Sequence, residues 1–375
     1  MGKKFNQLDD SVKVLLWHLP WDEMGKNQER LLHPEKGPYF YFRRSKSPLQ
    51  ERLIQLIDHS KIPRVMIHGS AHVDNYSKTK DAFGLVDFDR AYRGPYIWDV
   101  ICLLMAIHLR NPEHHEQPLA PSIRETFQEY YLSHFLHPDQ FYIPYKPLEN
   151  ITLKPWEENI EEYMKSNKKW AKQLSEAPIE LSDPFATTLL HEFLAHHPRK
   201  KIFSDFEICN ISFASGSFGR KRYLYLLKNK KGESIFLDIK ETKNFLAAPW
   251  KHVQFYKNPY ASDGERLFES TKIYAPDFLA YESYATLKGV DYWGREIPIL
   301  NRKPNKTFCE EEQIDFAMAG GSQLGRGHRL SLYEASPEEF LQHFRLEYPR
   351  LIEITNLLLE EVLAVWGRYC EVYGN

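Results

Sequence analysis

A short polar loop near residue 70 carries side chains whose types and spacing suit phosphoryl transfer. Enzymes of that chemistry place a base aspartate and a magnesium-binding asparagine five positions apart, so that one loop serves both the nucleophile and the metal. Ser70 and Asn75 have this spacing, and the apolar run at 64–69 leads into them. Because serine stands where the aspartate is expected, the loop keeps a metal ligand and lacks its base.

Other titratable side chains crowd the same loop. Asp74, and Asp89 further along the chain, are candidates to replace the missing base through a water molecule. His72 is predicted to brace the loop by hydrogen bonding, and His68 completes the set of candidate catalytic residues. The hydroxyl of Ser70 is itself too weak a base to take the place of a carboxylate.

An acidic tripeptide, Asp87-Phe88-Asp89, follows the next apolar run, twelve residues beyond Asn75. In kinases a strand-end aspartate binds the magnesium that bridges the phosphates of the nucleotide. Asn75 and Asp87 are therefore predicted metal ligands, and Asp89 is either a further ligand or a structural acceptor. Loop capping is the plainer reading of Asp87 and Asn75, since both residue types also cap turns well.

A glycine-bearing turn between two strand-like runs offers a place for phosphate. Glycine lets the backbone approach an anion and direct N–H groups at it. The predicted contacts are four consecutive residues, Gly216, Ser217, Phe218 and Gly219. Serine and glycine between strands are also typical of ordinary hairpins, so this turn indicates a phosphate site only in combination with the other motifs.

Lys240 ends the apolar run at 234–240, 21 residues after Gly219. In kinases a lysine on the strand after a glycine-rich hairpin pairs with phosphate, and a carboxylate of the following helix holds it in place. Glu265 and Glu269 are the candidates for that carboxylate, one helical turn apart, and Glu265 is preferred.

These parts would form a site for ATP and Mg²⁺, but their order along the chain is inverted. In ordinary kinases the glycine loop and the lysine precede the catalytic loop, whereas here they follow it by more than a hundred residues. A circular permutation explains the inversion if the chain termini lie close together, as they often do in domains.

As a set, the motifs resemble those of the bacterial domain-of-unknown-function 2252 family, and the loop at 68–75 is similar to the H-G-D-x-x-x-x-N loop of aminoglycoside-phosphotransferase-like kinases. The resemblance spans about residues 38–330 and is strongest in 38–103 and 206–243. The matching stretches are PYFYFR at 38–43, GSAH at 69–72 with Asn75, DFDR at 87–90, Gly94-Pro95 with Trp98-Asp99, GSFGR at 216–220, and Lys240-Glu241.

The resemblance implies a kinase-like fold and site rather than a particular reaction, because the activity of that family is largely unassigned. Three positions depart from the family pattern: Ser70 replaces an aspartate, Arg90 replaces a glutamate, and Cys102 replaces an arginine. Two acids and one base are thus lost near the predicted chemistry.

Composition limits the class of protein. The 375 residues are 42% hydrophobic and 14% aromatic, which excludes a disordered chain. A net charge of −2 gives no sign of a nucleic-acid partner. No run approaches the roughly 18 apolar residues that span a membrane, and the N-terminus lacks an apolar signal core. Four widely spaced cysteines favour a reducing cytoplasm, with delivery into another cell left open.

Hydrophobic periodicity predicts a mixed α+β chain. The motifs and the resemblance together imply a two-lobed, protein-kinase-like fold. The expected parts are a helical lead at 1–35, the catalytic-loop part of the helical lobe at 36–200 with a Pro- and His-rich helical insertion at 110–200, a small antiparallel β lobe at 203–305, and C-terminal helices at 306–375 that complete the larger helical lobe. The expected elements include an extended aromatic run at 37–44, strands at 64–69, 82–89 and 295–301, and helices at 47–61, 97–109 and 262–273.

The predicted function is that of a kinase-like protein that binds ATP and Mg²⁺, with an unidentified small-molecule or protein acceptor. Losing a general base costs about 10²–10⁴ in rate, so both a weak or altered phosphotransferase and a pseudokinase that binds nucleotide as a switch stay open. The main alternative is a non-catalytic interaction module built on a relic kinase-like fold, with aromatic segments 37–44 and 140–145 as docking surfaces.

Two hydrolase readings are weaker. A serine hydrolase would need a G-x-S-x-G turn around Ser70, and no glycine follows it at the required place. A metal hydrolase using His68 and His72 lacks the H-E-x-x-H pattern.

Overall fold

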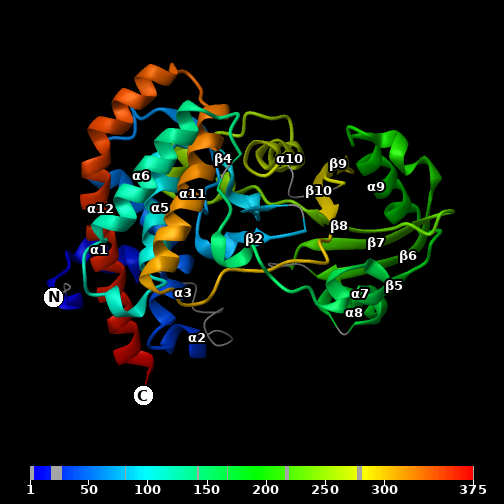
Figure 1. The fold of residues 1–375 in the computed structure, drawn as a ribbon, viewed down its shortest axis with the longest axis horizontal. Helices are drawn as coiled ribbons and strands as arrows, with labels where there is room; N and C mark the ends of the chain where they lie inside the picture. Colours follow the sequence, from blue (N-terminus) through cyan, green and yellow to red (C-terminus); the bar gives the residue numbers. More distant parts are fainter. Residues whose placement is uncertain are drawn as a thin grey trace.

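The computed structural model describes residues 4–17, 28–80, 82–141, 143–166, 168–215, 219–276 and 281–374. The fold is mixed α+β: a large helical body and a sheet covered by shorter helices lie side by side (Figure 1). Both contain hydrophobic side chains that are fully removed from solvent. The two parts meet along the strands and loops in the middle of the molecule.

The main sheet is antiparallel, with strand order β5-β6-β7-β8-β10-β9. Strands β6 to β8 form the meander that the sequence predicts, and a Lys-Gly turn joins the last two, with Gly232 at φ +87°. Glycine suits that turn because a positive φ carries no Cβ penalty there. The strands are β5 (Pro178–Ile179), β6 (Phe206–Ser215), β7 (Lys221–Asn229), β8 (Ser234–Glu241), β9 (Ser283–Leu287) and β10 (Val290–Glu296).

Helices cover both faces of this sheet. One face packs on α9 (Pro184–Ala195), whose Leu189 and Phe193 are fully buried. The other face packs on α7 (Ile160–Lys165) and α8 (Lys169–Glu176). Between β8 and β9 the chain forms α10 (Asp263–Tyr274), which contacts the sheet edge and also reaches the helical body.

The helical body is built around α5 (Ile97–His108), in which every residue is buried. Beside it lie α6 (Pro121–Leu136) and α11 (Glu310–Leu330). These two helices can pack closely because Gly325 of α11 has no Cβ, which would otherwise collide with the carbonyl oxygen of Tyr131. The body also contains α3 (Gly37–Arg44), α4 (Lys46–Leu56) and the long α12 (Pro337–Tyr373).

Two small antiparallel sheets inside the helical body carry the loops of interest. One pairs β1 (Arg64–Ile67) with β4 (Tyr92–Pro95), and the other pairs β2 (Tyr76–Lys78) with β3 (Phe83–Leu85). The loop at 68–75 therefore runs from the first sheet to the second, and the loop at 86–91 runs back. This connection brings the two loops together.

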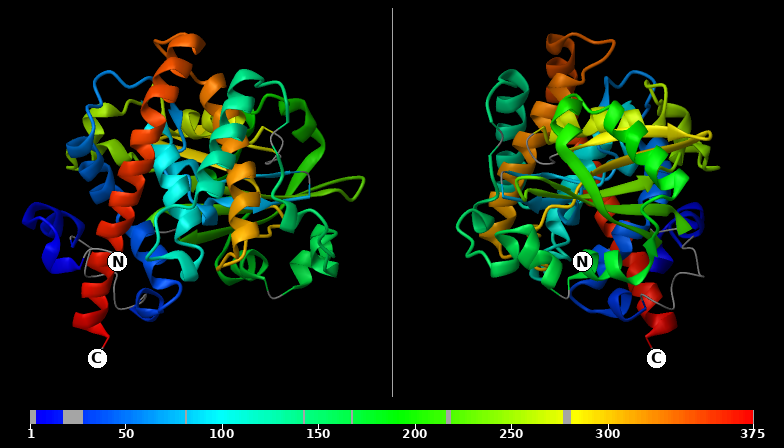
Figure 2. Two further views of the ribbon diagram at one scale, coloured as in Figure 1. Left: turned by 60° about the vertical axis from the view of Figure 1, so that its left-hand side comes forward. Right: turned by 90° about the vertical axis from the view of Figure 1, so that its right-hand side faces the viewer.

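The first and last described helices lie side by side. Helix α1 (Asp10–Leu16) and α2 (Gln28–Leu32) both contact α12. The rings of Trp17 and Tyr373 stack at a centroid distance of 6.4 Å. Figure 2 shows the blue N-terminal segment beside the red C-terminal helix from two further directions.

Two expected elements were wrong. Segment 37–44 is helix α3 and not an extended run, because Pro38 suits the first helical turn and the buried face of Tyr39, Tyr41 and Phe42 packs in the body. Aromatic residues favour strands only weakly, so tertiary packing overrides that preference. A strand was also expected at 295–301. The observed strand, β10, runs from Val290 to Glu296 and shares only the first two residues of that range.

The segment at 110–200 divides between the two parts of the molecule. Its first helix, α6, belongs to the helical body, whereas α7 to α9 cover the main sheet. Across the described residues, none of the helices combines the length and apolar character needed to cross a bilayer.

Candidate functional site

A cavity of about 1140 Å³ lies where the helical body meets the main sheet. Its lining is strongly cationic: eleven lysine and arginine side chains of the described residues face three aspartates, in a chain whose overall charge is −2. The lining cations are Arg30, Arg43, Arg44, Lys46, Arg90, Arg220, Arg222, Lys240, Lys243, Arg295 and Lys303. Such a lining favours a ligand with several negative charges.

The loop at 68–75 enters this cavity and is held from behind by α5. Both carboxylate oxygens of Asp99 accept backbone N–H groups, from His68 at 2.6 Å and from Gly69 at 2.9 Å. Trp98 Nε1 donates to the carbonyl oxygen of Gly69 at 3.0 Å. Gly69 has φ +71°, and a Cβ there would collide with the carbonyl of Arg90, so glycine is required. Trp98 and Asp99 thus fix where the next residue, Ser70, sits.

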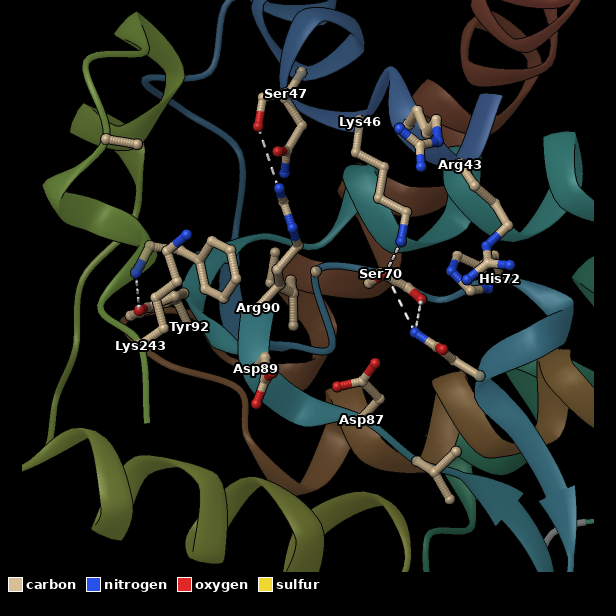
Figure 3. Close-up of a pocket in the computed structure, with 18 of the residues that line it drawn as sticks. Arg43, Lys46, Ser47, Ser70, His72, Asp87, Asp89, Arg90, Tyr92 and Lys243 are labelled. Carbon is tan, nitrogen blue, oxygen red and sulfur yellow. Dashed lines mark hydrogen bonds between the residues drawn. The ribbon is translucent and has the colours of Figure 1, made fainter. Parts of the chain in front are cut away.

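Ser70 lies in the cavity wall with two nitrogen donors on its hydroxyl oxygen (Figure 3). Lys46 Nζ donates to Ser70 Oγ from helix α4. Asn75 Nδ2 donates to Ser70 Oγ at 3.2 Å and to the carbonyl oxygen of Ser70 at 3.0 Å. Burial away from water lowers the pKa of Lys46 to about 7. Lys46 carries no sign of function in the sequence, because nothing in the pattern of its own segment distinguishes it from other lysines.

The two loop histidines do not contact the serine hydroxyl. His68 is fully buried, does not line the cavity, and places Nε2 3.1 Å from the carbonyl oxygen of Val86. His72 lines the cavity, and its ring packs on the edge of Tyr39. Burial lowers the pKa of both imidazoles, so both are neutral near pH 7. His68 is therefore a packing residue here, and no serine–histidine pair forms at Ser70.

Asp74 is surrounded by cations. Arg43 binds its carboxylate at 2.6 Å, Lys306 binds it at 3.1 Å, and Arg110 is a third partner. Burial would raise the pKa of Asp74, but these three cations outweigh it and hold the pKa below its ordinary value. A carboxylate so stabilised in its ionised form is a poor proton acceptor, which argues against Asp74 as the replacement base.

Asp87 faces the cavity with an exposed carboxylate (Figure 3). Its backbone is left-handed, with φ 70°, a conformation that is unusual for a residue other than glycine. No hydrogen bond or ion pair to its carboxylate is found within the part of the chain that the structure describes. Strained backbone conformations are often retained at functional sites, and Asp87 is one of the few acids lining this basic cavity.

Asn75 lines the same cavity. Its Nδ2 group donates to Ser70, and its backbone N–H donates to the carbonyl of His72. In the described ranges, Oδ1 of Asn75 has no hydrogen-bond donor. Asn75 and Asp87 thus line one cavity from neighbouring loops, each with a side-chain oxygen that has no partner among the described residues.

Asp89 connects the helical body to the main sheet. Lys240 Nζ of β8 lies 2.9 Å from one carboxylate oxygen, and Arg220, just before β7, lies 2.8 Å from the other. Burial would raise the pKa of Asp89, but the two cations outweigh it and hold the pKa well below the ordinary range. Asp89 is therefore ionised at neutral pH and acts as the acceptor that bridges the two parts.

The prediction that Glu265 or Glu269 pairs with Lys240 is wrong. Glu265 accepts the backbone N–H of Ala261 at 3.0 Å at the start of α10, and Glu269 pairs with Lys272 at 2.6 Å. Asp89 takes the place of the helix carboxylate at Lys240, because α10 turns Arg266 and not a glutamate toward the loop at 86–91.

Arg266 anchors α10 to that loop. The side chain is fully buried and donates from Nη1 to the carbonyl oxygens of Phe88, Asp89 and Ala91. Its Nε donates to Asp263 at 2.9 Å. Sequence reasoning missed Arg266, since its role depends on contacts with a segment that is distant along the chain.

Only part of the glycine turn can be placed. Gly216, Ser217 and Phe218 lie outside the described residues. Gly219 has φ +71°, next to Arg220, which reaches Asp89. The end of this turn therefore leads directly into the cationic lining.

The donor set fits a magnesium ion that is shared with phosphate oxygens. No group of three or more His, Cys, Asp or Glu side chains in the described ranges could hold a metal ion alone. Magnesium is commonly bound by one or two protein oxygens together with the phosphates of a nucleotide. Asp87 and Asn75 supply such oxygens, and the surrounding lysines and arginines suit the remaining phosphate charge.

One protein family matches the chain over most of its length. The family described as "Uncharacterized protein conserved in bacteria (DUF2252)" matches residues 29–133 and 161–356. No curated protein and no solved structure shows significant similarity.

Proposed function

This chain belongs to that DUF2252 family, and from this premise we propose that it binds ATP with Mg²⁺ in the cationic cavity. The carrying observation is the combination of Asp87 and Asn75, two oxygen donors facing one space, with Lys240 and Arg220 on the opposite wall. This combination matches what a nucleoside triphosphate needs: a shared metal and several fixed positive charges.

Each wall has a defined part in this proposal. Asp87 and Asn75 would hold the metal, and the metal, when bound, would neutralise the charge on the phosphate oxygens. Lys240 and Arg220, now paired with Asp89, would contact phosphate from the sheet side. Both remain near the cavity because Asp89 fixes them there.

A kinase-like, circularly permuted architecture is consistent with the strand arrangement. Kinases carry their phosphate lysine on the third strand, after a glycine-rich hairpin and before a helix. Here Lys240 is on β8, the third strand of the meander β6-β7-β8, and α10 follows. The contact of α1 with α12 is consistent with the permutation, since a permuted order requires these two segments to lie side by side.

Transfer to a free acceptor should be slow or absent. Kinases turn over at about 1–100 s⁻¹, and losing a general base costs about 10²–10⁴ in rate, which leaves roughly 10⁻⁴ to 1 s⁻¹. Neither alternative base is available, because Asp74 and Asp89 are both committed to cations. We therefore propose a nucleotide-binding protein whose transfer to external acceptors is weak.

Thermal unfolding with and without ATP and Mg²⁺ tests the proposal. A ligand at 100 times its dissociation constant adds about 2.7 kcal/mol to the free energy of unfolding, which should raise the midpoint by about 3 °C. The rise should require Mg²⁺ and should disappear in Lys240→Ala and in Asp87→Ala. Lys272→Ala is the matched control, since Lys272 is exposed, does not line the cavity and pairs with Glu269 on α10.

Two outcomes would change the conclusion. No shift at millimolar nucleotide would leave a kinase-like fold without nucleotide and favour an interaction protein. A shift that survives in Asp87→Ala and Lys240→Ala would move the nucleotide out of this cavity. If the shift behaves as expected, Ser70→Asp then tests whether the base alone is missing.

A further inference from the structure

The contact between Lys46 and Ser70 gives the serine a role other than that of a failed base. Ser70 Oγ accepts from Lys46 Nζ, both side chains are less than a tenth exposed, and both line the cavity with Asp87 and Asn75. A lysine beside a serine hydroxyl is one of the known arrangements that activate serine as a nucleophile, in which the neutral amine accepts the hydroxyl proton.

The surroundings of Lys46 favour its neutral form. Within the described ranges no carboxylate contacts Nζ, and its hydrogen-bond partner is the uncharged hydroxyl of Ser70. Arg43 and Arg90 add positive charge nearby, and the carboxylate of Asp87 offsets part of it. Burying a charged amine without a counter-charge in contact costs stability, so this pair is poorly explained as a stabilising contact.

We propose that Ser70 is itself the phosphoryl acceptor, with Lys46 as the base that takes its proton. The proposal rests on the nucleotide site proposed above and names the acceptor of that site. The departure from the family pattern then changes the acceptor: an aspartate would activate an external hydroxyl, whereas Ser70 supplies the hydroxyl.

The step balances with a nucleoside triphosphate as the only co-reactant. Ser70 Oγ forms a bond to the terminal phosphorus, and the bond from that phosphorus to its bridging oxygen breaks. The electron pair of that bond leaves with the nucleoside diphosphate. The hydroxyl proton passes to neutral Lys46 Nζ, so the product pairs a new phosphoserine with a new ammonium group.

The product would be well stabilised where it forms. Lys46 and the amide of Asn75 already donate to the hydroxyl oxygen of Ser70. Arg43 and Arg90 lie in the same wall (Figure 3) and could neutralise a phosphate dianion. Phosphoserine would also restore a negative charge at the position where the family carries aspartate.

The test is to incubate the purified full-length protein with ATP and Mg²⁺ and to map modified residues by tandem mass spectrometry. We expect one phosphoryl group on the peptide that contains Ser70. Ser70→Ala and Asp87→Ala should abolish it, and Ser70→Thr should retain it. Ser47→Ala is the matched control, since Ser47 is a neighbouring cavity serine bonded to Arg90 and not to Lys46.

Lys46 variants separate a base from a positioning group. Lys46→Met should slow the modification by about 10²–10⁴-fold, the usual contribution of a general base. Lys46→Arg keeps a cationic donor but cannot lose its proton, so it should be equally slow. An arginine variant that reacts at the natural rate would overturn the role of Lys46 as base.

Thermal midpoints measured on the same samples distinguish the two proposals. A magnesium-dependent shift with phosphoserine at residue 70 supports both. A shift without modification, or with equal modification in Ser70→Ala, overturns the acceptor role and leaves nucleotide binding intact. Absence of both shift and modification overturns the nucleotide site and the acceptor role together.

Discussion

At the scale of single residues, the three departures from the family pattern gather around one lysine. Ser70 contacts Lys46, and Arg90 and Cys102 both contribute to its electrostatic surroundings. With serine and arginine where acids are expected, no carboxylate of the described residues contacts Lys46, and burial lowers its pKa to about 7 although Asp87 opposes the shift. The thiol of Cys102, also buried, has its pKa raised to about 12 and stays protonated. The substitutions therefore alter one local charge balance and are not scattered losses.

Lys46 should leave a signature in stability against pH. Between its folded pKa of about 7 and its ordinary value of 10.5, the unfolded chain binds the extra proton, so the free energy of unfolding rises with pH. The expected slope is about 1.4 kcal/mol per pH unit. From pH 7 to 9 the natural protein should gain about 2–3 kcal/mol relative to Lys46→Met, measured by denaturant unfolding.

The quantity to compare is the difference in the free energy of unfolding between the natural protein and Lys46→Met at each pH. Glu282 is buried with a pKa raised to about 8, so its contribution to stability falls with pH up to that value and opposes the rise. That contribution cancels when the variant is subtracted. Ser70→Asp should flatten the profile as Lys46→Met does, because a carboxylate would raise the pKa of Lys46. Parallel profiles for the natural protein and Lys46→Met would refute a neutral lysine.

At the scale of elements, two helices hold the site loops from opposite sides. Helix α5 fixes the loop at 68–75 through Trp98 and Asp99, and α10 fixes the loop at 86–91 through Arg266. Trp98, Asp99 and Arg266 do not themselves line the cavity. Their role is positional: small shifts in either loop would separate Asp87 from Asn75.

Asp99→Asn tests the first of these anchors. An amide keeps the shape of the carboxylate but loses the charge, and one of the two backbone N–H groups would meet an N–H donor. Hydrogen bonds to a charged group contribute about 1.5–3 kcal/mol each, so we expect a loss of roughly 3 kcal/mol in urea unfolding. Asp10→Asn, at an exposed position of helix α1, should change stability by less than about 0.5 kcal/mol.

Trp98→Phe is the milder companion variant. It keeps a buried aromatic ring but removes the bond from Nε1 to Gly69 and part of the buried indole volume, so it should cost about 2 kcal/mol. If Asp99→Asn proved no more harmful than Trp98→Phe, the carboxylate would not be the main anchor of the loop.

At the scale of the whole molecule, the cavity depends on how the sheet meets the helical body. Asp89 belongs to the body, and its partners Lys240 and Arg220 belong to the sheet, so these ion pairs cross the junction. Buried ion pairs of this kind add little net stability, but removing one partner leaves uncompensated charge. The cationic cavity in a chain of net charge −2 also shows that positive charge is concentrated around this cavity.

Asp89→Asn should loosen that junction. Without the carboxylate, Lys240 and Arg220 lose their fixed partner, and the end of β7 should open more often. We expect faster amide hydrogen exchange at 220–226 and unchanged exchange within α5, which is buried in the body. Unchanged protection in both segments would show that other contacts hold the sheet in place.

The local spacing of apolar and turn residues predicted many of the helices, strands and loops of this protein from the sequence alone. The meander around Lys240, helices α4, α5 and α10, and the order of the loops at 68–75 and 86–91 follow from periodicity and turn residues, which act over a few positions. The family match also follows from these local motifs. The candidate metal ligands could be named in the same way, because the five-residue spacing from Ser70 indicates Asn75 and the end of an apolar strand indicates Asp87.

Only the tertiary structure decided which side chains meet. Lys46 reaches Ser70 across 24 residues, and Lys240 reaches Asp89, not Glu265, across 151 residues. Such contacts depend on how α4, α10 and the main sheet pack, and packing leaves no periodic trace in one sequence. The same reason explains the helix at 37–44, whose aromatic residues suit a strand locally and are buried as a helix by the surrounding body.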